Sequence, residues 1–301
     1  MKKLSSSALS VKFIKLETPR HFLLSGLWLG PDKPSRVFIF IHGLGGSIFS
    51  RHELFGSLVD SKTAVLTFNN RGSGLVNGLK KVKNGNSFYQ GLGGVAHEIF
   101  TDCVDDIDGA VSLANLSGVK EIYLIGHSTG CQKSVYYLAK RPKSLVRGAV
   151  LLAPVSDYSA LMKEVNISKY RRALATAKRL VARNNPHGLL PNLVWEGIID
   201  AQRFLSLYTP DSSEEIFSYA SDRFPSILRQ VKKPLLVVLA GQDRYHDRPA
   251  IDLAAWFNQA LSNRPAQIGI IDEVDHDFSP AFSALAKSIK RWATSQFFRK
   301  K

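Results

Sequence analysis

Six short, uninterrupted apolar runs, separated by longer segments of helical spacing, constrain the fold of this chain more than any other feature. A strand carries a continuous apolar run when helices cover both faces of its sheet. Alternation of such strands with helices is typical of βαβ units and of a mostly parallel sheet. The sequence therefore predicts an α/β fold, with strands at residues 37–41, 64–68, 122–125, 149–153, 234–240 and 267–271.

Two further apolar runs, V-K-F-I-K-L and F-L-L-S-G-L-W-L, lie between about residues 10 and 30. Their partial alternation predicts an antiparallel pair at the sheet edge, which brings the expected sheet to eight strands. The strand–helix rhythm then breaks between the fourth and fifth runs. We therefore expect a core formed by residues 1–155 and 234–301, and a helical lid or small second domain formed by residues 156–233.

The expected lid has one clear helical pattern, an apolar stripe at residues 170, 173, 174, 177, 180 and 181. The stripe predicts packing inside the lid, with a substrate wall as the alternative. Trp195, Phe204 and Leu205 are candidate walls of a substrate pocket, but ordinary core packing is the leading interpretation of each. The basic cluster within residues 163–183 is a candidate source of preference for anionic substrates.

The chain of 301 residues has a formal net charge of +15, which can attract nucleic acid, anionic lipid or an acidic substrate. Its basic residues are spread, however, between a loop with Lys80, Lys81 and Lys83, the cluster 163–183 and the tail 299–301. No zinc-finger, RRM-like or KH-like pattern accompanies them. We therefore interpret the charge as a solvated basic surface and expect no nucleic-acid partner.

Cys103 and Cys131 are too few for a disulfide framework and have no neighbours at metal-ligand spacing. Both lie in helical patterns, where an unpaired cysteine behaves as a small apolar residue. We expect no metal and no cofactor. No apolar run approaches the roughly 20 residues of a membrane span, and Lys12 and Lys15 interrupt any signal-peptide core, so we expect a cytoplasmic protein.

The stretch G-H-S-T-G, residues 126–130, joins the apolar run I-Y-L-I to the helical pattern S-V-Y-Y-L-A. Small residues two positions either side of Ser128 let a strand turn abruptly into a helix that packs tightly on it. The side chain at the apex is then held clear at the helix N-terminus, which is the arrangement of a nucleophile elbow. The sequence predicts Ser128 as a nucleophile, with a helix N-cap as the alternative.

A serine nucleophile needs a base and an acid that orients the base. Asp243 follows the strand at 234–240, and His276 follows the strand at 267–271, in the chain order Ser, Asp, His. Both are expected at the carboxyl edge of the sheet, where open α/β sheets carry their sites. The alternatives are His246 as the base, and Asp247 or Asp157 as the acid.

The oxyanion hole requires two backbone N–H groups, one after the nucleophile and one in the loop after the third strand. These groups belong to Thr129 and, in the loop H-G-L-G-G, to Leu44. We expect the ring of His42 to bond to the backbone of this loop rather than to act in catalysis.

Four stretches carry a family resemblance: G-H-S-T-G-C-Q (126–132), A-P-V-S-D (153–157), R-F-L-S-L-Y-T-P (203–210) and P-L-L-V-V-L-A-G-Q-D (234–243). With them the chain resembles an α/β-hydrolase, and within that superfamily it is similar to the fungal fusarinine-type siderophore esterases. The resemblance implies a Ser128–Asp243–His276 triad and hydrolysis of ester or peptide-like bonds. The chain departs from these esterases in the glycine-rich loop 69–94 and in the basic segment 163–183, which we expect to border the site.

The leading hypothesis is a serine carboxylesterase that acts on a siderophore-like or other small-molecule ester through an acyl-enzyme intermediate. One alternative is an acyltransferase or peptidase that uses the same triad. The other is a non-catalytic binding protein on a hydrolase fold. The substrate-binding residues and the oligomeric state stay open at this point.

Overall fold

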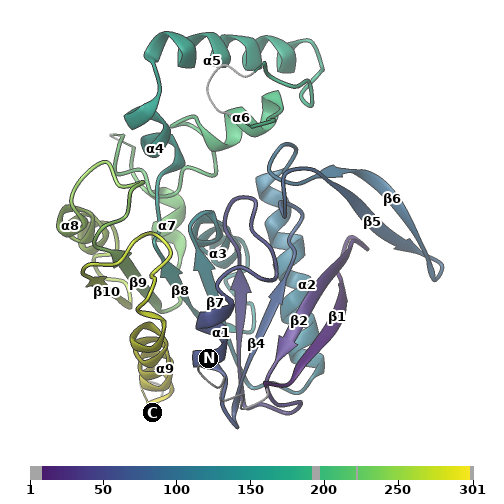
Figure 1. Cartoon of the computed structure of the whole chain (residues 1–301), viewed down its shortest axis with the longest axis vertical. Coiled ribbons are helices and arrows are strands. Elements are labelled where there is room, and N and C mark those ends of the chain that lie inside the picture. The colour runs from purple at the N-terminus through teal and green to yellow at the C-terminus, as the bar shows by residue number, and fades with distance from the viewer. Residues whose placement is uncertain (1–8, 192–196, 222, 299–301) are drawn as a thin grey trace, which may run out of the picture.

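The computed structural model describes residues 9–191, 197–221 and 223–298. Eight of the described strands form one sheet, in the order β1-β2-β4-β3-β7-β8-β9-β10 (Figure 1). β1 and β2 are antiparallel, β2 is antiparallel to β4, and the remaining pairs are parallel, which confirms the predicted eight-stranded sheet. The strands are β1 Val11–Glu17, β2 Leu23–Leu29, β3 Arg36–Ile41, β4 Thr63–Phe68, β7 Glu121–His127, β8 Val146–Leu152, β9 Leu235–Ala240 and β10 Ala266–Ile271.

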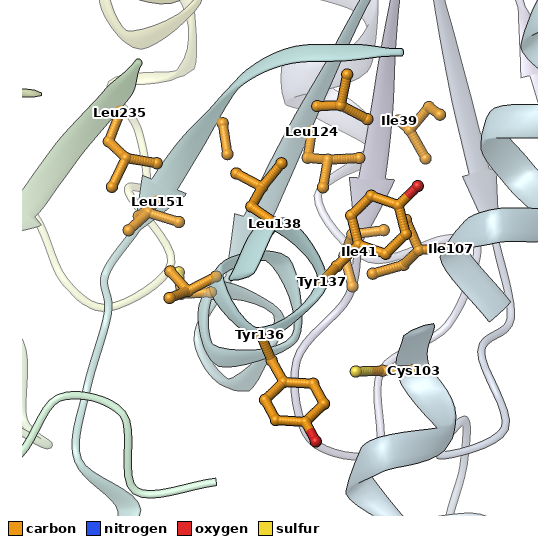
Figure 2. Packing of buried hydrophobic residues seen from close by; sticks show 14 of the residues in the cluster. Ile39, Ile41, Cys103, Ile107, Leu124, Tyr136, Tyr137, Leu138, Leu151 and Leu235 are labelled. Carbon is orange, nitrogen blue, oxygen red and sulfur yellow. The ribbon is translucent and has the colours of Figure 1, made fainter. Parts of the chain in front are cut away.

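Helices cover both faces of this sheet, as the uninterrupted apolar runs predict. On one face pack α1 (His52–Leu58) and α9 (Phe282–Phe298), and on the other α2 (Cys103–Leu116), α3 (Thr129–Lys140) and α8 (Ala250–Ala260). Figure 2 shows the second face, where side chains of β7 and β8 meet those of α3 and α2.

The two cysteines lie on this second face of the sheet. Cys103 and Cys131 are both free and buried in the apolar cluster, where they pack as small side chains, as predicted.

The predicted insertion contains α4 (Asp157–Glu164), α5 (Ile167–Ala182), α6 (Ala201–Leu207) and α7 (Ser226–Gln230). The first three lie beyond the carboxyl edge of the sheet and share an apolar cluster of their own (Figure 1). Most of the predicted stripe on α5 packs in that cluster, whereas Val181 is exposed. The insertion then returns to the core, where Ile216, Phe217, Tyr219, Leu228 and Val231 pack on the face that holds α3 and α8.

The structure describes two of the three candidate pocket walls. Phe204 and Leu205 pack within the insertion's own cluster, as the core-packing interpretation predicts. Trp195 lies outside the described residues.

The glycine-rich segment was predicted as a loop, and that prediction was wrong. The segment contains an antiparallel hairpin, β5 (Asn77–Lys83) and β6 (Asn86–Gly93), so Lys80, Lys81 and Lys83 lie on a strand. Asn84 and Gly85 close it with φ values of 52° and 78°. Positive φ at both central residues is the requirement of a type I′ turn, which Asn-Gly meets at low cost.

Within the part of the chain that the structure describes, no helix is long and apolar enough to cross a bilayer.

Candidate active site

Ser128 sits at the junction of β7 and α3 with an unusual backbone conformation, φ 54° and ψ −128°. A positive φ is strained for a residue with a side chain, and such strain is concentrated at functional sites. Its side chain makes no capping hydrogen bond to α3. The N-cap explanation of this serine therefore loses its physical basis, and the strand–turn–helix context of a nucleophile elbow is met.

The flanking glycines are required by close backbone contact. A Cβ on Gly126 would lie 2.3 Å from the carbonyl oxygen of Gly130, and a Cβ on Gly130 would lie 2.1 Å from the carbonyl oxygen of Ile41. Real Cβ atoms do not approach backbone this closely, so any side chain here would push α3 away from β7 and β3.

His276 and Asp243 meet as predicted, at the ends of the last two strands of the sheet. The Nδ1 of His276 lies 2.6 Å from Oδ2 of Asp243, and the Asp243 side chain is fully buried. The other carboxylate oxygen of Asp243 accepts the backbone N–H of Tyr245 at 2.9 Å. Burial alone would raise the pKa of Asp243, but the hydrogen bond and charge of His276 outweigh it, and the pKa is lowered. The carboxylate is thus ionised and holds the Nδ1–H of His276, which leaves Nε2 as the acceptor.

The alternative acids have other partners. Asp247 forms a two-bond ion pair with Arg248, with both distances 2.9 Å. Asp157 accepts a hydrogen bond from the side-chain amide of Gln132 at 2.8 Å. Burial, with the charges of Glu214 and Glu215 adding to it, raises the pKa of Asp157 well above its usual range. Among the described residues, neither acid has a histidine as a hydrogen-bond partner, whereas Asp243 pairs with His276.

The alternative base, His246, lies on the far side of the acid. Its Nε2 is 3.4 Å from Oδ2 of Asp243, and burial lowers its pKa. It does not line the cavity that holds Ser128 and His276. Geometry therefore favours His276 as the base.

The loop after β3 lies directly against Ser128, since a Cβ on Gly43 would be 2.9 Å from Cβ of Ser128. The backbone hydrogen bonds of the described residues give no partner to the N–H groups of Leu44 and Thr129. Two such donors beside a candidate nucleophile are what an oxyanion hole would need.

His42 holds this loop in place. Its Nδ1–H donates to the carbonyl of Gly43 at 2.9 Å, and its Nε2 accepts the backbone N–H of Asn70 at 3.2 Å. Burial, followed by the charge of Lys133, lowers the pKa of His42 to about 4, so the ring is neutral and can fill both roles. The ring bonds to loop backbone, as the sequence predicts.

A cavity of about 760 Å³ lies above Ser128. Ser128, His276 and Leu44 line it. The insertion and the residue just before it contribute Val155, Asp157, Ala160, Leu161, Glu164, Val165 and Tyr208 to the lining of the cavity. None of the basic residues in 163–183 lines it; the cations at its wall are Arg51 and Arg244.

Residues 85–294, more than half of the chain, match a family model described as "Protein of unknown function (DUF1749)". The chain belongs to this family. No curated protein sequence matches the DUF1749 chain.

Solved structures give its fold. The siderophore hydrolase EstB from Aspergillus fumigatus is 20% identical, with a TM-score of 0.66 over 97% of this chain and 99% of that one. Est1E from Butyrivibrio proteoclasticus, solved with ferulic acid bound, is 16% identical, with a TM-score of 0.63 over 94% and 99%. A dienelactone hydrolase from Anabaena variabilis is 15% identical, with a TM-score of 0.53 over 95% and 98%. The DUF1749 chain therefore has the α/β-hydrolase fold, as the sequence resemblance implies.

Two residues of the elbow motif that the sequence left without a role support the site in this DUF1749 chain. The buried ring of His127 donates from Nε2 to the carbonyl of His276 at 2.9 Å, which fixes the loop that carries the candidate base. Burial lowers the pKa of His127 to about 3, so this donor stays neutral. Gln132 donates to the carbonyl of Val155 and to Asp157, which ties α3 to the start of the insertion. The stretches G-H-S-T-G-C-Q and A-P-V-S-D thus meet in space.

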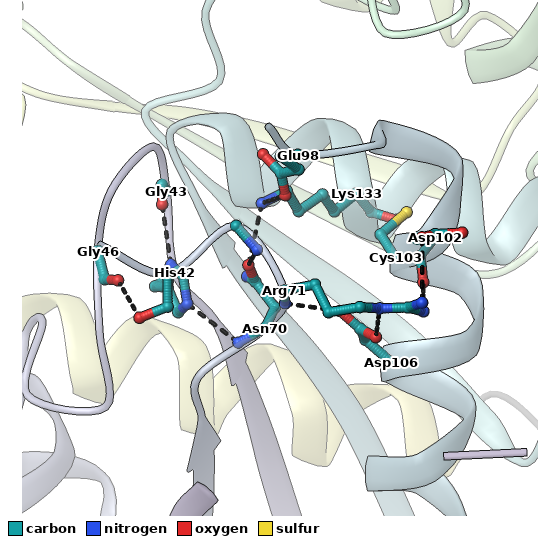
Figure 3. A network of polar contacts seen from close by, with 12 residues as sticks. His42, Gly43, Gly46, Asn70, Arg71, Glu98, Asp102, Cys103, Asp106 and Lys133 are labelled. Carbon is teal, nitrogen blue, oxygen red and sulfur yellow. Dashed lines mark hydrogen bonds and ion pairs between the residues drawn. The ribbon is translucent and has the colours of Figure 1, made fainter. Parts of the chain in front are cut away.

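A buried ionic network continues from α3 into the insertion. Lys133 pairs with Glu98 at 2.5 Å, Glu98 with Arg203 at 2.9 Å, and Arg203 with Glu214 at 2.5 Å. Burial would raise the pKa of Glu98, but Lys133 and Arg203 outweigh it and lower that pKa to about 2. Figure 3 shows the core end of this network, where Lys133 also reaches Asn70 and hence the His42 loop. The hydrophobic periodicity of the sequence did not predict this network, because charged residues in helical patterns ordinarily face solvent.

Proposed function

We propose that this protein is a serine carboxylesterase that cleaves small-molecule esters. One observation carries the proposal: Ser128 and His276 line the same cavity, and the far side of the His276 ring is held by ionised, buried Asp243. The elbow backbone at Ser128 and the two unused N–H groups at Leu44 and Thr129 add the other parts that acyl transfer needs.

In the proposed reaction, Oγ of Ser128 attacks the ester carbonyl carbon while Nε2 of His276 takes the hydroxyl proton. The N–H groups of Leu44 and Thr129 stabilise the oxyanion. The tetrahedral intermediate collapses, the C–O bond to the alcohol breaks, and His276 returns the proton to the departing alkoxide. Water, activated by the same ring, then hydrolyses the acyl-Ser128 ester. Asp243 stabilises the imidazolium in both halves of the reaction.

The cavity volume falls within the roughly 300–1,000 Å³ that small-molecule sites occupy. EstB is described as a siderophore hydrolase, and Est1E binds ferulic acid, which supports esters as the substrate class. We propose a siderophore-like or other small-molecule ester of comparable bulk. Because α4 contributes to the lining of the cavity, the insertion determines which ester fits, and it takes no part in the chemical steps.

The reaction is tested by labelling with a fluorophosphonate probe and by turnover of p-nitrophenyl esters of increasing chain length. Wild-type protein should be labelled and active, and Ser128→Ala should lose labelling and at least ~10⁴-fold of the turnover. Ser47→Ala, a change in the same region outside the cavity lining, is the matched control. Transfer of the acyl group to an added alcohol or amine in preference to water would identify an acyltransferase, and turnover confined to amides a peptidase. A folded wild-type protein that neither reacts with the probe nor turns over any ester would indicate a binding protein.

The role of α4 is tested by Leu161→Ala against Leu190→Ala. Both leucines are buried in the insertion's own cluster, but only Leu161 lines the cavity. Leu161→Ala should move the preferred acyl length upward by a few carbons, since the lost side chain leaves space for them. If the two variants preferred esters of the same chain length, α4 would not determine which ester the protein prefers.

A further inference from the structure

A second cluster of ionisable side chains lies away from the cavity, where the insertion meets the core. Nδ1 of His97 is 2.9 Å from Oδ2 of Asp200, and Nδ1 of His187 is 2.8 Å from the same oxygen. These three potential ligand atoms all lie within 4.8 Å of one another. His97 belongs to the core segment after β6, whereas His187 and Asp200 belong to the insertion. None of the three lines the candidate active site.

Asp200 presents a single oxygen to this cluster. Its Oδ1 accepts the backbone N–H of Arg203 at 2.8 Å and caps α6, and its own backbone N–H donates to Ala96 at 2.9 Å. The side chain is fully buried. An ionised carboxylate without access to water is costly unless a cation or several donors face it. Oδ2 is therefore a strong site for positive charge.

Hydrogen bonds to backbone carbonyls hold the chain in place next to both histidines. The N–H of Ala201 donates to the carbonyl of Gly188 at 3.0 Å, which fixes the turn that carries His187 beside Asp200. The side-chain amide of Gln202 donates to the carbonyl of Glu98 at 3.1 Å, next to His97. The ring of His97 is nearly buried, while that of His187 is 54% exposed and gives access from solvent.

We propose that His97, His187 and Asp200 form a Zn²⁺ site that fastens the insertion to the core. Two imidazole nitrogens and one carboxylate oxygen are ligands that zinc favours, and water entering beside His187 supplies the fourth position. Tetrahedral bonds of about 2.0–2.1 Å separate ligand atoms by roughly 3.3 Å. Opening the two N–O distances by about half an ångström therefore makes room for the ion. The bond from Oδ1 to Arg203 orients the carboxylate, as an outer partner does in metal sites.

The site is tested on the full chain in the Ser128→Ala form, so that neither the outcome nor its failure depends on catalysis. Protein stripped with a chelator is titrated with Zn²⁺ by calorimetry and by thermal unfolding. One equivalent should bind and raise Tm by several degrees. His97→Asn and His187→Asn should each weaken binding by at least about tenfold, because even outer partners of ligands contribute 10–100-fold. His52→Asn, a change at an exposed histidine beside Glu53, is the matched control and should bind Zn²⁺ as the parent does.

Co²⁺ gives a readout that needs no variant to fold, since four-coordinate Co²⁺ absorbs visible light far more strongly than aqueous Co²⁺. A strong band that Zn²⁺ bleaches is expected. Absence of Zn²⁺ binding to the stripped protein would overturn the proposal and leave a histidine–carboxylate clasp. So would binding that persists unchanged in both histidine variants, or that is lost in a His276→Asn protein with His97 and His187 intact.

Discussion

Two buried aspartates in this protein are built alike and face different surroundings. In both Asp243 and Asp200 one carboxylate oxygen accepts a backbone N–H, and the other faces two histidine nitrogens. At Asp243 the two distances are unequal, 2.6 Å and 3.4 Å, and the nearer ring lines a cavity beside a serine. At Asp200 they are nearly equal, 2.9 Å and 2.8 Å, and the rings join two parts of the chain. The same carboxylate–histidine pairing is thus a candidate for acid–base chemistry only at Asp243, where the nearer ring shares a cavity with Ser128.

Neutralising each aspartate in turn gives the largest expected difference between the two sites. Asp243→Asn should lower kcat/KM for p-nitrophenyl esters by about 10³–10⁴-fold, because the His276 tautomer is no longer fixed and its imidazolium is not stabilised. Asp200→Asn should change kcat/KM of the folded protein by less than about threefold, since it lies outside the cavity. Asp247→Asn and Asp157→Asn serve as controls. A larger loss in Asp157→Asn than in Asp243→Asn would move the acid to α4.

The free energy of unfolding, unlike kcat/KM, should fall strongly when Asp200 is changed. Asp200→Ala removes the cap of α6 and leaves two histidines without their shared acceptor, so unfolding free energy should fall by about 3–5 kcal/mol. The measurement is urea unfolding of the metal-stripped protein, with the fluorophosphonate reaction of the folded fraction as the second readout. A loss below about 1 kcal/mol would mean that the cluster does not hold the insertion.

A third buried carboxyl, without a histidine, sharpens the comparison through pH. Glu215 accepts a hydrogen bond from the Ser156 hydroxyl, and burial raises its pKa from 4.5 to about 7. A pKa that is higher in the folded state gives stability that is complete below pH 4.5 and is lost as the pH rises to about 7, by up to about 3 kcal/mol. Glu215→Gln should remove this slope. For Asp243, whose folded pKa is lowered, the sign is reversed: its contribution is present above its ordinary pKa and is lost in acid. If the unfolding midpoints of wild-type and Glu215→Gln protein changed in parallel from pH 4.5 to 8, Glu215 would not be the source of the pH dependence.

The smallest effect concerns the second histidine at Asp243. His246 lies 3.4 Å from the carboxylate, too far for a strong hydrogen bond, so His246→Asn should cost about 1 kcal/mol, or roughly fivefold in kcat/KM. A loss as large as that of His276→Asn would instead make His246 the base. That outcome would also require it to reach the cavity.

The parts of the molecule that the sequence predicted are those with a local pattern. The apolar runs defined the parallel strands because each is short and buried on both faces, and the elbow glycines marked Ser128 because their spacing is dictated by backbone contact. Asp243 and His276 followed from their places after strands. The Asn84–Gly85 turn between K-K-V-K and N-S-F-Y is a hairpin signal, but the many glycines around it also fit a loop.

Long-range polar pairing gave no such pattern. His97 and Asp200 are 103 positions apart, and Arg203 reads as an ordinary surface residue of a helix until Glu98 and Glu214 are placed beside it. The residues of the insertion that line the cavity could not be predicted for the same reason, since which face of a helix covers a site depends on how the insertion is docked.

The buried chain of charges from Lys133 through Glu98 and Arg203 to Glu214 has a consequence for recombination between relatives. An insertion borrowed from another hydrolase that had the acid at position 214 but no arginine at position 203 would bury an excess anion, and one that had the arginine without the acid would bury an excess cation. Either chimaera would lose several kcal/mol of stability, because it would bury an unpaired charge beneath α3. Donor segments for chimaeras should therefore be chosen by the charges at these four positions before their cavity-lining residues are considered. Amide-exchange rates of α6 and α3 should rise together when the match is poor.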